Sequence, residues 1–101
     1  MENCIFCSII KGDIPAKIIY EDDRVIAFND VNAQAPVHFL VIPKEHISTA
    51  NDASDEALMG RLSITAANVA KEQGFDQNGY RLVMNCNSDG GQTVSHIHLH
   101  C

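Results

Sequence analysis

Three histidines alternate with aliphatic residues near the end of this 101-residue sequence, in the order His96, Ile97, His98, Leu99, His100. Successive side chains on a β-strand point to opposite faces, so the three imidazole rings would share one face. Imidazole can act as a nucleophile, a general base or a metal ligand near neutral pH. Because three of the five histidines of the sequence lie here, the segment indicates a functional site rather than a solvated strand face.

Two kinds of chemistry fit the histidine segment. Two rings could bind one metal ion and leave a catalytic position open, or one ring could be a nucleophile or general base that its neighbours orient. The preceding loop, residues 85–93, supplies paired glycines, backbone N–H groups, an amide and hydroxyls, which can together bind an anion. This loop favours phosphoryl or nucleotidyl transfer, although Asp89-Gly90 is also typical of an ordinary hairpin turn.

A second chemical signal is the pair Cys4-x-x-Cys7. A disulfide framework is not expected in a reducing cytoplasm, so this spacing indicates metal binding or redox activity. The redox interpretation is weaker, because a thioredoxin-like motif follows a strand and this pair begins the sequence. Two half-buried thiols on a short helix are the structural alternative.

The elements that position these residues follow from periodicity and from stop signals. The helix at 54–73 has an apolar stripe at helical spacing, possible caps at Asp52 or Ser54, and Gly74 at its end. The other expected elements are a short helix at 4–11 that ends at Gly12 and strands at 17–21, 24–29, 38–42, 80–85 and 94–100. This order predicts an α+β fold with a mostly antiparallel sheet and the helices on one side.

Length and composition set limits on the class of protein. The 101 residues, 46% hydrophobic and 20% charged, predict a single domain over 1–101. A net charge of −6 argues against nucleic-acid binding through a broad basic surface. The apolar runs are too short to cross a membrane. Met1-Glu2-Asn3 has no secretory character, so a cytoplasmic protein is expected.

Residues 88–100, which run from Ser88 through the three histidines, resemble the signature of the histidine triad (HIT) family and most closely its Hint branch of nucleoside phosphoramidate hydrolases. The resemblance extends over nearly the whole sequence and includes residues 13–17, 28–30, 34–44 and 46–47. It implies a five-stranded sheet with one long and one short helix. It also implies a homodimer in which the long helices pair and the two sheets join into ten strands.

The resemblance implies a role for each matching residue. The middle histidine, His98, attacks the α-phosphorus and is transiently nucleotidylated, and Asp30 accepts the ribose hydroxyls. Near the phosphate and the leaving group lie His100, Gln92, Thr93, Asn85 and Gly91. The apolar cleft around the base is formed by Phe6, Ile9, Ile14, Val31 and Leu40. A further histidine, His38, lies behind the triad, where orientation of a ring and plain packing remain equal interpretations.

The resemblance also implies a structural zinc site formed by Cys4, Cys7, His46 and His96, which are the ligand types of a tetrahedral site. No catalytic metal or organic cofactor is expected. The expected substrates are purine nucleoside 5′-phosphoramidates, with AMP or GMP as ligands. The family signature continues past the triad into a Gly-Gly segment and a tail, whereas this sequence ends at Cys101.

Three functions therefore stand side by side. The first is a phosphoramidate hydrolase with a histidine nucleophile. The second is a nucleotide-binding scaffold whose catalysis is weak or lost without the tail, and the third is a zinc hydrolase that uses the triad as ligands. Chelation would abolish the activity of the third, whereas in the first it would at most destabilise the fold.

Overall fold

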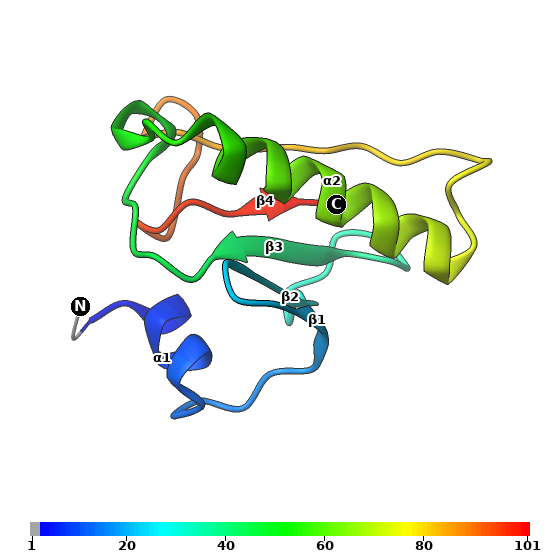
Figure 1. The fold of residues 1–101 in the computed structure, drawn as a ribbon, viewed down its shortest axis with the longest axis horizontal. Helices are drawn as coiled ribbons and strands as arrows, with labels where there is room; N and C mark the ends of the chain where they lie inside the picture. The colour runs from blue at the N-terminus through cyan, green and yellow to red at the C-terminus, as the bar shows by residue number, and fades with distance from the viewer. Residues whose placement is uncertain (1–2) are drawn as a thin grey trace.

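The computed structural model describes residues 3–101 and has an α+β fold. Its four strands form one antiparallel sheet in the order β1-β2-β3-β4 (Figure 1). The elements in chain order are α1 (Ile5–Lys11), β1 (Ile18–Glu21), β2 (Val25–Asn29), β3 (Phe39–Pro43), a 3₁₀ turn (Ala50–Asp52), α2 (Glu56–Gln73) and β4 (Leu99–His100). The segment that carries the histidines thus pairs with the central strand β3.

The sheet buries both of its faces, because β2 and β3 are apolar at nearly every position. One face packs against α2, whose stripe of Leu58, Leu62, Ala66 and Val69 is buried as the helical spacing predicts. The opposite face packs against Phe6 of α1. Strands buried on both sides read as continuous hydrophobic runs rather than as alternating patterns.

The expectation that both helices lie on one side of the sheet is wrong. Figure 1 shows α1 and α2 on opposite sides of the strands. The physical reason lies in the alternate positions of β2 and β3, such as Ile26, Phe28 and Leu40, which are as apolar as their neighbours and point away from α2. These side chains need a second cover, and α1 supplies it.

The sheet has four strands in place of the five expected. The predicted strand at 80–85 is reduced to a single bridge, in which Val83 and His100 exchange two backbone hydrogen bonds of 2.8 and 3.0 Å. The predicted strand at 94–100 shortens to β4, because the backbone N–H of Ile97 donates to the carbonyl of Ile47 (2.7 Å) rather than to β3. Strand propensity alone does not reveal this competing loop partner.

Both helices end at the glycines expected, Gly12 and Gly74. The N-cap of α2 is Asp55, whose carboxylate accepts from the N–H of Leu58 (3.0 Å), and not Asp52 or Ser54. Asp52 instead belongs to the 3₁₀ turn that precedes the helix. No helix within residues 3–101 is long and apolar enough to span a membrane.

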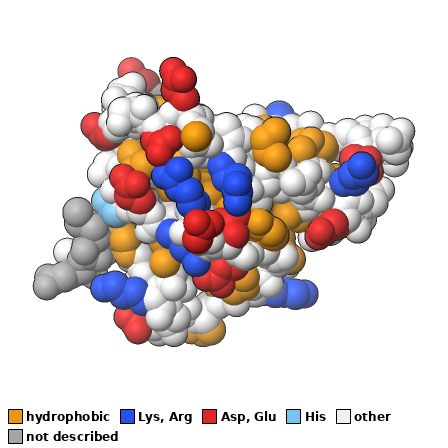
Figure 2. All heavy atoms as spheres, in the orientation of Figure 1, with side chains coloured by type: hydrophobic (Ala, Val, Ile, Leu, Met, Phe, Trp, Pro, Cys, Tyr) orange, Lys and Arg blue, Asp and Glu red, His pale blue; other side chains and the backbone are white. Residues whose placement is uncertain are grey.

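Ion pairs connect the β1–β2 turn to α2. Arg61 of α2 binds Asp22 (2.7 Å), and Arg24 binds the cap residue Asp55 (2.8 Å). Figure 2 shows basic and acidic side chains intermingled over this part of the surface. Burial raises the pKa of the Asp22 carboxyl, but hydrogen bonds from Arg61 and from two backbone N–H groups outweigh burial and hold this pKa well below its usual range.

Candidate active site and metal centre

The ring of His98 presents one nitrogen for chemistry because its other nitrogen is held by the backbone. Its Nδ1 lies 2.7 Å from the carbonyl oxygen of His96, and both groups are buried. A carbonyl oxygen can only accept, so Nδ1 carries the proton and Nε2 carries the lone pair. The edge-on ring of Phe6, with centroids 5.1 Å apart, packs against the imidazole. The hydrogen bond and the packing of Phe6 together fix the orientation of the His98 ring.

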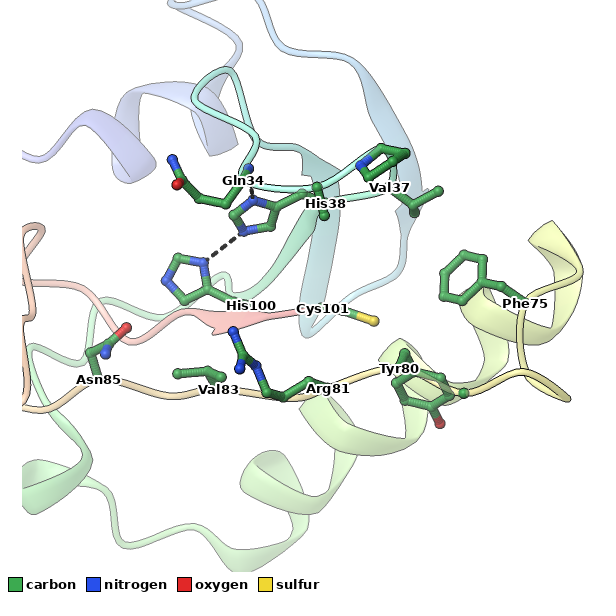
Figure 3. Close-up of a pocket in the computed structure, with 13 residues that line it drawn as sticks. Gln34, Val37, His38, Phe75, Tyr80, Arg81, Val83, Asn85, His100 and Cys101 are labelled. Atoms are coloured by element: carbon green, nitrogen blue, oxygen red, sulfur yellow. Dashed lines mark hydrogen bonds between the residues drawn. The ribbon is translucent and has the colours of Figure 1, made fainter.

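A chain of hydrogen bonds gives His100 the opposite tautomer. The backbone N–H of Gln34 donates to Nδ1 of His38 (3.0 Å), so the proton of His38 lies on Nε2. That Nε2–H lies 3.0 Å from Nδ1 of His100, which therefore accepts and carries its own proton on Nε2 (Figure 3). Burial lowers the pKa of His100, with His98 and His38 contributing, and favours this neutral N–H donor at pH 7.

A pocket of about 380 Å³ brings the two rings together with most of the expected nucleotide-binding residues. Asp30 lies beside the rings, with Oδ2 at 3.4 Å from Nε2 of His38 and 4.0 Å from Nδ1 of His100. Thr93 also lines the pocket. The apolar part of the lining includes every predicted base-cleft residue, namely Phe6, Ile9, Ile14, Val31 and Leu40. The pocket thus combines apolar walls, one carboxylate and three imidazoles, those of His38, His98 and His100.

Three other predicted residues, Asn85, Gly91 and Gln92, lie outside the lining of this pocket. Asn85 lines a neighbouring pocket of about 560 Å³ that shares His38 and His100 with the first. Its amide donates to the carbonyl of Gly90 (2.7 Å). The side-chain amide of Gln92 donates to the backbone carbonyls of Ser48 (2.7 Å) and Val94 (2.9 Å), and the first of these bonds joins the loop to the segment after β3.

The loop before the triad is folded tightly on itself. The backbone N–H groups of Gly91 and Gln92 donate to carbonyls of the same loop, at 3.0 Å each. A side chain at Gly90 would meet the carbonyl oxygen of Cys86 at 2.5 Å, so this close approach requires glycine. Anion binding by this loop stays a prediction, and the roles of Asn85, Gly91 and Gln92 stay predictions with it.

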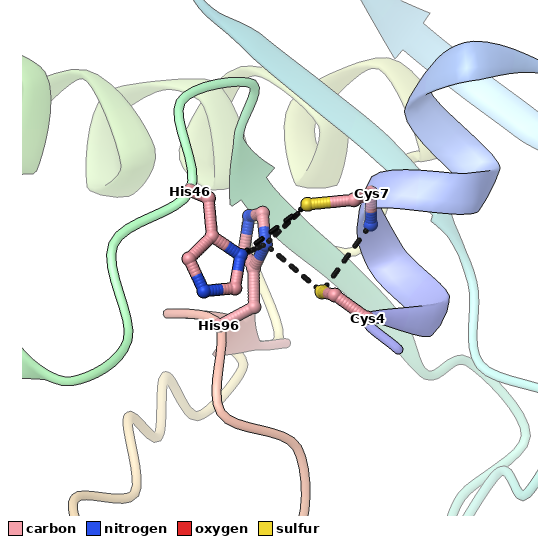
Figure 4. Close-up of side chains that lie close together, drawn as sticks. All are labelled: Cys4, Cys7, His46 and His96. Atoms are coloured by element: carbon pink, nitrogen blue, oxygen red, sulfur yellow. Dashed lines mark hydrogen bonds between the residues drawn. The ribbon is translucent and has the colours of Figure 1, made fainter. Parts of the chain in front are cut away.

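Four residues from three distant parts of the chain form a candidate metal centre on the α1 side of the sheet (Figure 4). The two imidazole Nδ1 atoms of His46 and His96 lie 3.2 Å apart. The sulfur–nitrogen distances are 3.4 Å from Cys4 to His96, 3.3 Å from Cys7 to His46 and 3.7 Å from Cys7 to His96. A zinc ion with ordinary bond lengths needs edges of about 3.4 Å between nitrogens and about 3.6 Å between nitrogen and sulfur. The four residues therefore fit tetrahedral zinc.

The surroundings of His96 support a ligand role for its Nδ1. The Nε2 atom lies 2.8 Å from the carbonyl oxygen of Pro43 in a buried position, so the proton occupies Nε2 and the Nδ1 lone pair faces the sulfur atoms. Burial lowers the pKa of His96, which keeps the ring neutral as a ligand must be. The first histidine of the triad thus differs in tautomer from the second.

Asp30, His38 and His100 form a second cluster whose ligand atoms are close enough for a metal ion. The hydrogen bond from Gln34 opposes that use, because it occupies Nδ1 of His38 and places the proton on the nitrogen that would bind the ion. This cluster is therefore better described as a hydrogen-bond relay than as a metal site.

Comparison with known proteins gives one consistent result. The HIT domain family model matches residues 11–101. The purine nucleoside phosphoramidase of Escherichia coli K12 is 48% identical over 101 residues, covering 98% of this chain and 85% of that protein. The chain belongs to the HIT family. The structure of a HIT family hydrolase from Legionella pneumophila superposes with a TM-score of 0.94 at 50% identity, covering 97% of this chain and 89% of that one. A histidine triad protein from Clostridium difficile gives 0.95 at 48% identity, covering 99% and 89%.

Sequence reasoning on this HIT protein missed a residue that acts through its main chain. The backbone N–H of Gln34 sets the tautomer of His38, and a pattern of side chains in the sequence cannot predict such a main-chain contact. Ile5, Pro15 and Phe28 also line the nucleotide-sized pocket. Their signal in the sequence is that of ordinary core or loop residues.

Proposed function

We propose that this chain hydrolyses the P–N bond of purine nucleoside 5′-phosphoramidates through a covalent nucleotidyl intermediate on His98. The chain is an enzyme of the HIT hydrolase family. The observation that carries the proposal is the 2.7 Å hydrogen bond from Nδ1 of His98 to the His96 carbonyl, because it leaves Nε2 as a free nucleophile at the pocket. The E. coli relative, at 48% identity, is named a purine nucleoside phosphoramidase.

In the first step, the lone pair on Nε2 of His98 attacks the α-phosphorus. A P–N bond to the imidazole forms as the P–N bond to the leaving amine breaks, and the amine takes a proton as it departs. Nε2–H of the neutral His100 ring, whose centroid lies 5.0 Å from that of His98, donates a hydrogen bond to the leaving nitrogen, and water supplies the proton that the amine takes. The pair thus divides the work between one nucleophile and one donor.

In the second step, water attacks the phosphorus and gives up a proton to the solvent as the bond between the phosphorus and Nε2 of His98 breaks. The nucleoside monophosphate is released, and the imidazole regains its lone pair on Nε2. The His96 carbonyl stabilises the charged ring of the intermediate, because Nδ1–H becomes a stronger donor once the ring carries the phosphoryl group. The backbone therefore serves the purpose that a buried carboxylate serves in other nucleophilic sites.

Asp30 and the apolar walls bind the nucleoside. One oxygen of Asp30 accepts from the backbone N–H of Asn32 (2.8 Å), which fixes the carboxylate in the pocket. An ionised carboxylate can accept both ribose hydroxyls. Apolar walls hold a base by stacking and burial rather than by reading its polar edge, so we expect adenine and guanine to bind comparably.

Cys4, Cys7, His46 and His96 would hold a structural zinc ion, which crosslinks α1 to the loop after β3 and to the triad segment. All four ligand positions come from the protein, so this centre has no open position for substrate. The catalytic steps above need no metal.

We also propose that two copies pair, as the family resemblance implies. The segment around Val83 lies at the edge of the sheet beside β4 and exposes Tyr80 and Leu82, with Ile64 of α2 exposed as well. A second copy would cover these apolar groups and extend the sheet toward ten strands. Light scattering coupled to size-exclusion chromatography tests this point, and a mass of one chain at micromolar concentration would contradict it.

The activity is tested with adenosine 5′-phosphoramidate as substrate, with and without EDTA, and His98→Ala as the matched inactive variant. We expect AMP release that survives EDTA in the wild type and is absent in the variant. Rapid acid quench followed by mass spectrometry should find the AMP moiety on a peptide that contains His98. A folded wild type that binds AMP without releasing it from the substrate would favour a nucleotide-binding protein instead.

A further inference from the structure

The candidate metal centre and the nucleotide pocket share one short helix. Cys4 caps α1 and Cys7 lies in its first turn, so the helix begins at the two sulfur ligands. Ile5, Phe6 and Ile9 of the same segment line the pocket. A shift of the helix backbone at the two cysteines would therefore also shift one wall of the pocket.

The helix needs tertiary contacts to hold its position, and those of the candidate centre add to the packing of Phe6 on the sheet. It has seven residues, and a helix of this length is not stable by itself in water. Phe6 is the buried residue of α1, while Ile5 is about half exposed. The centre joins α1 to His46, after β3, and to His96, at the other end of the chain.

A second path leads from the centre to the nucleophile. His96 would bind the metal through Nδ1, and its carbonyl oxygen accepts from Nδ1–H of His98. The ring of Phe6 packs edge-on against both histidines, with centroids 5.8 Å and 5.1 Å away. The metal ligands and the reacting ring are therefore separated by one peptide segment and one aromatic side chain.

We propose that the Cys4–Cys7–His46–His96 centre controls nucleotide affinity, so that metal loading fixes α1 against the pocket and metal loss releases it. The proposal rests on the proposed function, because it takes AMP as the ligand of the pocket. Metal and nucleotide would then bind cooperatively although they do not touch. Thermodynamic linkage requires the effect to be reciprocal and equal in both directions.

The first experiment measures AMP affinity by isothermal titration calorimetry on the whole chain, zinc-loaded and metal-stripped. Typical coupling between sites is about 5- to 150-fold, and we expect a loss of about tenfold on stripping. Cys7→Ser should bind AMP as weakly as the stripped wild type and should not respond to added zinc. The matched control is Cys86→Ser, which removes a thiol outside the centre and should retain both affinities.

The second experiment measures the same coupling as a change in zinc affinity, and it needs neither a variant nor an activity assay. Zinc affinity of the wild type is measured by competition with a chromogenic chelator, with and without saturating AMP. The same tenfold factor should appear as tighter zinc binding. Far-UV circular dichroism of the stripped chain should still report the sheet and α2, since the helix at issue is short.

The outcomes separate this proposal from the one it rests on. A zinc-loaded chain that does not bind AMP overturns the proposed function and the coupling together. Equal AMP affinity in the zinc-loaded and the metal-stripped protein overturns the coupling alone. A zinc affinity that is the same with and without AMP does so as well. Loss of the whole fold on stripping also overturns it, because zinc would then be a global stabiliser and not a control on one wall.

Discussion

His96 and His98 are two residues apart on the same face of the same segment, yet their rings have opposite tautomers. His96 donates from Nε2 to the carbonyl of Pro43 and turns Nδ1 toward two sulfur atoms. His98 donates from Nδ1 to the carbonyl of His96 and leaves Nε2 at the pocket. The cysteine–histidine cluster and the pocket thus contain the same type of side chain in different tautomers, and in each case a backbone carbonyl oxygen determines which ring nitrogen carries the proton.

The cluster and the pocket also differ in which groups they leave available to a ligand. The cysteine–histidine cluster has all four of its groups facing one another, so it is suited to a closed structural ion. The pocket leaves groups available to a ligand, because it is lined by Asp30 and by His98 and His100, each of which keeps one ring nitrogen or N–H without a hydrogen-bond partner among residues 3–101. A site whose ligand groups all bind one ion favours stability, whereas a site that leaves groups free for a substrate favours turnover. Four predictions test this division.

The largest effect is expected from His98→Ala. We expect turnover of adenosine 5′-phosphoramidate to fall about 1,000-fold or more, as for the loss of other catalytic nucleophiles. Zinc content and the melting temperature should stay close to those of the wild type, because His98 does not belong to the cluster. Zinc lost together with activity would show that the His98 side chain is itself needed to hold the metal.

Asp30→Asn probes the pocket alone. Loss of a charge-assisted hydrogen bond to the ribose should weaken AMP binding about tenfold or more. The loss should be smaller for 2′-deoxyadenosine monophosphate, which offers one hydroxyl fewer, and calorimetry with both ligands gives the comparison. Equal losses for the two ligands would place the ribose elsewhere.

Cys7→Ser probes the cysteine–histidine cluster. The variant should lose zinc, and its melting temperature should fall by at least about 5 °C, roughly 1 kcal/mol for a chain of this size. The same chelator treatment that lowers the melting temperature of the wild type should leave that of the variant unchanged. Scanning calorimetry measures both, and a chelator-insensitive wild type would contradict a structural zinc.

The smallest effect is a pH dependence that arises from His100. Burial lowers the pKa of this ring, so below about pH 6.5 the unfolded chain binds its proton more readily than the folded chain does. Stability should therefore fall as the pH decreases from about 6.5 toward the lowered pKa. The zinc-loaded His100→Asn variant should show a shallower fall in urea titrations between pH 7 and pH 5, and an equal slope would exclude His100 as the source.

Much of the local structure followed from sequence patterns because it depends on neighbours in the chain. The spacing of Leu58, Leu62, Ala66 and Val69 predicted the buried face of α2, and Gly74 marked its end. Side-chain alternation correctly placed Ile97 and Leu99 in the core and all three histidines on the other face. The prediction of a fifth strand at 80–85 was wrong, because strand pairing there depends on residues that are distant in the sequence.

The site divides in the same way. The residues of each motif, Cys4-x-x-Cys7 and the histidine triad, lie within a few positions of one another along the chain. Their types and spacing therefore indicated metal binding and nucleophilic chemistry from the sequence alone. The tertiary structure decided which groups meet, because the cluster joins residues up to 92 positions apart. It also decided which nitrogen of each ring is free, since that depends on the carbonyls of Pro43 and His96 and on the N–H of Gln34.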